Sequence, residues 1–128
     1  MCRRLLCYGD SNTYGYDPQS YLGGRYPESV RWTGLLSTSG LYIINEGENG
    51  RSIPSQDWEI ETAAGMVRRS KAEVMVVMLG SNDLLHCPGF SAETCGVQMK
   101  KFLAALLAKT QTGLKILLVA PPSMTAGT

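Results

Sequence analysis

Four short apolar runs constrain the fold of this chain more than any other feature of its sequence. Each run is continuous rather than alternating, which is typical of strands that are buried on both faces of a parallel sheet. Segments with helical spacing of apolar residues separate them, so strands and helices are expected to alternate. The predicted strands are Leu5–Tyr8, Leu41–Ile44, Val74–Leu79 and Ile116–Ala120. The sequence therefore predicts an α/β fold with a parallel sheet and right-handed crossovers.

Three segments between these runs are predicted to be helices. In Gln56–Ser70 we expect Ile60, Ala64 and Val67 to face inward, and Val30–Ser37 is a second, shorter candidate. The third segment, 91–110, carries the longest apolar stripe, formed by Cys95, Met99, Phe102, Leu103, Leu106 and Leu107. No internal repeat or linker interrupts the pattern, so residues 1–128 are expected to form a single domain.

Composition narrows the function classes. A chain of 128 residues with 44% hydrophobic residues can bury a core of its own. The net charge is +1 and the basic residues are scattered, so neither nucleic acid nor a membrane is expected as a partner. The four cysteines lack the spacing of metal ligands, and no metal site is expected. No apolar run is long enough for a signal-peptide core or a transmembrane helix, which predicts a reduced, cytoplasmic setting.

Polar residues follow three of the four predicted strands, at the point where each strand ends. The clusters are Gly9–Asn12, Glu48–Arg51 and Gly80–Asp83. Because ligands bind outside the carboxyl ends of the strands in open parallel sheets, we expect the clusters to meet at one rim. This requires the first strand to lie between the second and the third.

Each cluster also has a purely structural interpretation. Asn49 and Gly50 form a common turn dipeptide, because both residues accept a positive φ. Ser81–Asp83 suits the start of a helix, and Gly9–Ser11 suits an ordinary turn from strand to helix. The occurrence of all three in order at strand ends favours a functional site.

The chemistry that such a rim supports is acyl transfer. Ser11, at a strand-to-helix turn, is placed to act as a nucleophile. A tetrahedral oxyanion needs two or three donors directed at one point. The backbone N–H groups of Ser11 and Gly50 and the side-chain amide of Asn82 suit this role, because glycine allows a close approach and asparagine donates without titrating.

These motifs resemble those of the SGNH or GDSL hydrolases. Gly9–Asn12 is similar to the first motif of that family, with Ser11 in the place of the nucleophile. Gly50 and Asn82 match the glycine and the asparagine of its oxyanion hole. The phrases V-R-W-T-G-L-L and N-G-R-S are most similar to the arylesterase and acyltransferase branch. The resemblance extends over about Leu5–Pro122, nearly the whole chain.

The resemblance implies a three-layer α/β/α, flavodoxin-like fold whose sheet usually has five strands, four of which are present here. It implies a serine esterase or acyl hydrolase that acts on small carboxylic esters through an acyl-enzyme at Ser11, without a cofactor. Four further residues of the motifs are then expected to bind substrate: Asp10, Asn12, Asn49 and Asp83.

One element of the family pattern has no match in this sequence. The family carries an Asp-x-x-His near its C-terminus, and its histidine activates the serine, whereas the single histidine here, His86, follows the third motif. We therefore expect a truncated form that keeps the nucleophile and the oxyanion hole, has at most feeble esterase activity, and does not use His86 as its base. An open sheet edge would remain, and association into a homo-oligomer is one way to cover it.

Two other functions are compatible with parts of the pattern. A non-catalytic α/β module would bind a small acyl or anionic ligand at the same rim, and a fluorophosphonate probe, which labels only an activated serine, separates it from an esterase. A phosphate or mononucleotide binder ranks last, because Gly9–Gly15 contains neither G-x-G-x-x-G nor a Gly-Lys-Ser/Thr ending.

Overall fold

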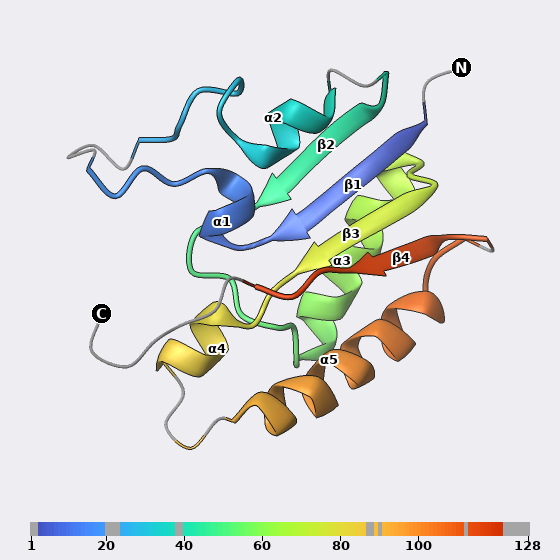
Figure 1. Cartoon of the computed structure of the whole chain (residues 1–128). Coiled ribbons are helices and arrows are strands. Elements are labelled where there is room, and N and C mark those ends of the chain that lie inside the picture. Colours follow the sequence, from blue (N-terminus) through green and yellow to red (C-terminus); the bar gives the residue numbers. More distant parts are fainter. Residues whose placement is uncertain are drawn as a thin grey trace.

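The computed structural model describes residues 3–19, 24–37, 40–86, 89, 91–111 and 113–121 (Figure 1). Its strands form a four-stranded sheet in the order β2-β1-β3-β4, and every neighbouring pair is parallel. The predicted parallel α/β fold is confirmed, as is the place of the first strand between the second and the third. The elements are β1 (Arg4–Gly9), α1 (Ser11–Tyr14), α2 (Trp32–Ser37), β2 (Tyr42–Gly47), α3 (Asp57–Ser70), β3 (Val74–Met78), α4 (Ser81–His86), α5 (Ala92–Leu107) and β4 (Lys115–Leu118).

The two central strands are buried and the two edge strands are not. All residues of β1 from Leu6 onward are buried, as are those of β3 from Met75 onward. In β2 and β4 no residue reaches that level of burial, and Leu117 is 57% exposed. The prediction of burial on both faces is therefore right for β1 and β3 and wrong for β2 and β4, which are the edge strands and have a neighbouring strand on one side only.

The core lies between one face of the sheet and the helices α3 and α5. Side chains alternate along a strand, so Leu6 and Tyr8 point to the same face as Met75 and Val77, their partners in β3. Buried side chains of the two helices pack against these four: Ile60, Ala64, Val67, Met99, Phe102 and Leu106. The inward residues predicted for α3 are confirmed.

The short helices α1 and α2 lie on the opposite face, over β2 (Figure 1). Asn45 connects them, because its Nδ2 donates to the carbonyl oxygen of Thr13 at 2.9 Å and to Oγ1 of Thr33 at 3.0 Å. Since these bonds satisfy its amide, a polar residue is tolerated inside the strand. β2 therefore continues to Gly47, whereas the sequence predicted its end at Ile44. The order of layers is helix, sheet, helix, as predicted.

All four strands point the same way, so α1, α4 and the connection from β2 to α3 lie at one end of the sheet (Figure 1). The three polar clusters of the sequence follow β1, β2 and β3 at this end. The strand order thus brings the clusters to one rim. No helix of the described residues has the length and apolar character needed to cross a membrane.

Candidate active site

Ser11 is the first residue of α1, a helix of four residues that follows β1 after a single intervening residue. That residue, Asp10, caps the helix: its Oδ1 accepts the N–H of Asn12 at 3.0 Å. Its carbonyl oxygen accepts the N–H of Tyr14 at 2.9 Å. Within the described part of the chain, the N–H of Ser11 donates to no other group. The strand-to-helix turn therefore leaves this N–H free for a ligand.

Gly50 lies in a tight turn after β2. The N–H of Arg51 donates to the carbonyl oxygen of Glu48 at 3.2 Å and closes the turn. Gly50 has a φ of 80°, a conformation that residues with a Cβ rarely adopt. The turn is attached to β1, because the N–H of Glu48 donates to the carbonyl oxygen of Gly9 at 3.1 Å. As with Ser11, the N–H of Gly50 has no acceptor among the residues that the structure describes.

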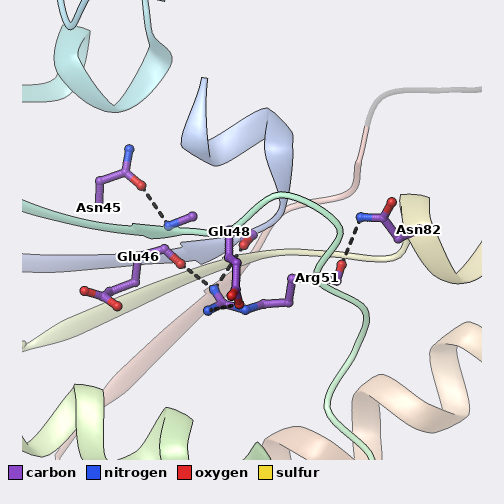
Figure 2. A network of polar contacts seen from close by, with 7 residues as sticks. Asn45, Glu46, Glu48, Arg51 and Asn82 are labelled. Atoms are coloured by element: carbon purple, nitrogen blue, oxygen red, sulfur yellow. Dashed lines mark hydrogen bonds and ion pairs between the residues drawn. The ribbon is translucent and has the colours of Figure 1, made fainter. Parts of the chain in front are cut away.

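Asn82 lies in the first turn of α4, directly after the end of β3. Its Nδ2 donates to the carbonyl oxygen of Arg51 at 3.0 Å (Figure 2). An asparagine Nδ2 carries two hydrogens. One of them holds the side chain beside the turn that contains Gly50, and the other has no acceptor among the residues that the structure describes. The structure thus joins the second and third clusters directly.

Two carboxylates of the clusters are buried. Asp83 is 4% exposed, and its oxygens accept the N–H of Ile53 at 3.1 and 3.3 Å. Asp10 is 1% exposed, and its Oδ2 has no hydrogen-bond partner among the described residues. Burial raises the pKa of Asp10, hydrogen bonds from Asn12 oppose the shift, and the charge of Asp83 adds to it. Burial favours a role for both carboxylates in holding the loops, whereas Asn12 and Asn49 are exposed.

Arg51 is the residue of this rim that the sequence analysis did not single out. Its Nη1 donates to the carbonyl oxygens of Glu46 and, at 3.1 Å, of Gly9. Its Nη2 donates to Oε2 of Glu48 at 3.0 Å (Figure 2). The guanidinium lies 4.1 Å from the centre of the Tyr8 ring. The signal was present in N-G-R-S, because an arginine directly after a turn glycine can reach back to the strand ends.

Comparison with known proteins identifies the family of the chain. The sequence model of the GDSL-like lipase/acylhydrolase family matches residues 7–128. The chain belongs to this family. No match was found among curated proteins.

Several solved structures share the fold. A protein assigned as an arylesterase from Agrobacterium tumefaciens str. C58 is 26% identical, with a TM-score of 0.80 over 98% of this chain and 66% of its own. A carbohydrate acetylesterase family member from Sinorhizobium meliloti is 30% identical, with a TM-score of 0.77 over 98% and 66%. The SGNH-hydrolase family esterase AlinE4 is 30% identical, with a TM-score of 0.61 over 92% and 58%. This chain thus spans less than two thirds of the length of these structures.

His86, the single histidine of this GDSL-like chain, is exposed at the end of α4. In the described ranges no hydrogen bond joins it to Ser11 or to a carboxylate. The prediction that it does not serve as the base stays a prediction.

Two cavities lie at opposite ends of the sheet. The smaller, of about 310 Å³, borders the rim and is lined in part by Gly50, Arg51 and Trp58. The larger, of about 470 Å³, lies at the amino ends of β3 and β4, remote from the three clusters. We assign the candidate site to the rim, because the free donors are there. The described residues contain no group of three or more His, Cys, Asp or Glu side chains suited to a metal ion.

Proposed function

We propose that this chain carries the nucleophile and the oxyanion hole of a serine esterase that hydrolyses small carboxylic esters. The Oγ of Ser11 adds to the ester carbonyl carbon and loses its proton to a base, and the carbonyl oxygen becomes an oxyanion. Collapse of this intermediate breaks the bond to the alcohol, which leaves with a proton. Water then cleaves the acyl–serine ester, which releases the acid and restores Ser11.

The observation that carries the proposal is the set of free donors at three neighbouring strand ends. Ser11 and Gly50 each present a backbone N–H with no acceptor in the described part of the chain, and Asn82 presents its second amide hydrogen. Donors that are already fixed need no reorganisation when negative charge develops on the substrate oxygen.

The relatives support an ester as substrate. The two proteins from Agrobacterium tumefaciens and Sinorhizobium meliloti are named for arylesterase and carbohydrate acetylesterase activities, and AlinE4 is an esterase. We carry over only the shared part, a small-molecule carboxylic ester. The proposed steps require no cofactor. Asn12 and Asn49, both exposed, are the proposed substrate contacts.

The mechanism requires a base that accepts the proton of the Ser11 hydroxyl. A base must come within about 2.6–3.2 Å of the serine hydroxyl. In residues 1–128 the Asp-x-x-His spacing occurs only at Asp83-Leu84-Leu85-His86, within the third motif, and His86 follows Asn82 on the same short helix. We expect the imidazole to lie on the oxyanion side of the rim, whereas the base should approach Ser11 from another direction. We therefore expect feeble activity from residues 1–128 alone.

The test is p-nitrophenyl acetate hydrolysis by the 128-residue chain and by its Ser11→Ala and His86→Ala variants. The proposal predicts a slow rate that falls to background in Ser11→Ala and is retained in His86→Ala. A rate that is the same in Ser11→Ala would contradict it and favour a non-catalytic binding module. A robust rate that His86→Ala abolishes would show that His86 is the base.

A further inference from the structure

We infer that Arg51 is a positioning residue for the proposed esterase reaction. It holds the Gly50 turn and the Asn82 amide together at the oxyanion position, without contact to the reacting atoms. The inference rests on the proposed function, because a positioning role presupposes a reaction at Ser11.

The side chain of Arg51 is anchored to two different strands. Its Nη1 donates to the carbonyl oxygen of Gly9, the last residue of β1, and to that of Glu46, near the end of β2. Hydrogen bonds from a charged donor are roughly twice as strong as neutral ones. The side chain therefore fixes the turn to the strand from which Ser11 follows.

The surroundings of the guanidinium restrict it to this position. The side chain is only 11% exposed, and a buried charge is costly unless its donors are satisfied. Glu48 supplies the opposite charge at 3.0 Å, and the Tyr8 ring lies against the guanidinium at 4.1 Å. Burial raises the pKa of Tyr8 to about 12, so the ring stays neutral beneath the cation.

The main chain of Arg51 connects this fixed side chain to the two donors, the Gly50 N–H and the Asn82 amide. Its carbonyl oxygen accepts the Nδ2 of Asn82 at 3.0 Å, and its N–H closes the turn on Glu48. Gly50 is its neighbour in the chain. A shift of Arg51 therefore displaces the N–H of Gly50 and the amide of Asn82 together, and a misplacement of about 1 Å can cost about 100-fold in rate.

The experiment compares Arg51→Met and Arg51→Lys with Arg68→Met as the matched control. Arg68 likewise donates to backbone, though to a single carbonyl, that of Lys109, and to a glutamate, Glu61, but it lies at the other end of α3. We measure kcat and KM for Ser11-dependent hydrolysis of p-nitrophenyl acetate. We also record the 15N–1H signals of the Gly50 amide and the Asn82 side-chain amide, and the unfolding temperature.

We expect Arg51→Met to lower kcat by about 10- to 100-fold while KM changes less than about twofold. The Gly50 and Asn82 signals should shift or broaden. Arg51→Lys should recover part of kcat, because an ammonium keeps the charge but cannot reproduce the planar fork. Arg68→Met should leave kcat and both signals unchanged. If Arg51→Met does not fold, the test uses Arg51→Lys, for which we expect an intermediate kcat and displaced Asn82 signals.

A folded Arg51 variant with the parental kcat and parental Gly50 and Asn82 signals overturns the inference, as does a loss confined to KM. The two proposals fail separately. If the parental chain shows no Ser11-dependent hydrolysis, the proposed function fails. The amide signals then test only whether Arg51 holds Gly50 and Asn82 in place: displaced signals support this structural part of the inference, and unchanged signals overturn it.

Discussion

The side-chain amide of Asn82 donates to the carbonyl oxygen of Arg51 across 3.0 Å, and its second hydrogen has no acceptor in the described part of the chain. We predict that Asn82→Ala lowers kcat for ester hydrolysis by about 10²- to 10³-fold, or about 3–4 kcal/mol of transition-state stabilisation. The reason is the loss of one oxyanion donor. Steady-state kinetics checks this, and an unchanged kcat with a raised KM would instead show that Asn82 only binds substrate.

Gly50 should be sensitive to substitution because of its backbone conformation rather than for lack of space. Its φ is 80°, and a Cβ there would meet no atom within 4 Å. Gly40 has a φ of 86° and the same open surroundings, but it precedes β2 at the far end of the sheet. We expect each change to alanine to cost about 1–2 kcal/mol of stability.

Only Gly50→Ala should also reduce kcat, by about 10- to 100-fold, because a change of φ that relieves the strain would displace an N–H that is a proposed oxyanion donor. Urea unfolding together with ester hydrolysis makes the comparison. Equal kcat values in the Gly50→Ala and Gly40→Ala variants would remove Gly50 from the oxyanion hole.

The close packing of β2 against α1 gives a second glycine prediction. A Cβ on Gly47 would lie 2.3 Å from the backbone nitrogen of Tyr14 and 2.7 Å from the carbonyl carbon of Thr13. Since neither backbone atom can move freely, Gly47→Ala should destabilise the fold by about 1–3 kcal/mol. Gly96→Ala is the control: it lies in α5 with no atom within 4 Å, and it should stabilise the chain by about 1 kcal/mol. Equal stabilities of the two variants in urea would show that α1 does not pack against β2 as described.

Asp10 allows a prediction about pH. Its pKa is raised in the folded state, mainly by burial. A raised pKa means that the folded state favours the protonated carboxyl, so the charged form reduces stability as the pH rises from the unfolded pKa to the folded one. Asp10→Asn keeps a good helix cap and removes the charge. Its stability relative to the parent should therefore increase over this pH window and then level off.

Urea unfolding at a series of pH values from acidic to neutral follows this difference. Asp10→Ala, which loses the cap as well, should be about 1 kcal/mol less stable than Asp10→Asn. If the stability difference between Asp10→Asn and the parent is constant over the whole pH range, folding does not shift the pKa of Asp10.

Much of the fold could be predicted from local patterns. The continuous apolar run from Val74 and the three- and four-residue spacing around Ile60 each correspond to one element of the structure. The burial of the edges could not be predicted in this way. The run in β4 is as apolar as that in β3, yet Leu117 and Leu118 are 57% and 52% exposed, because burial depends on which elements cover a strand.

The candidate site, too, could be predicted only in part. Ser11, Gly50 and Asn82 stand directly after strands, where sequence order and residue type indicate their chemistry. The phrase N-G-R-S indicates that Arg51 can reach the strand ends, but its partner could not be assigned from the sequence. The carbonyl of Gly9 is 42 residues away and comes within reach only when β1 and β2 pair. The end of β2 was missed for a related reason, since Asn45 is accepted in the strand only through its bonds to Thr13 and Thr33.

The most direct test of the account is the site at which a fluorophosphonate probe modifies the folded 128-residue chain, determined by peptide mass spectrometry. The account predicts one adduct, on Ser11, that forms slowly, is absent from Ser11→Ala, forms more slowly in Asn82→Ala and is retained in Ser52→Ala. An adduct on another serine, or no adduct on Ser11 in the folded chain, would contradict the claim that Ser11 is a nucleophile beside an oxyanion hole.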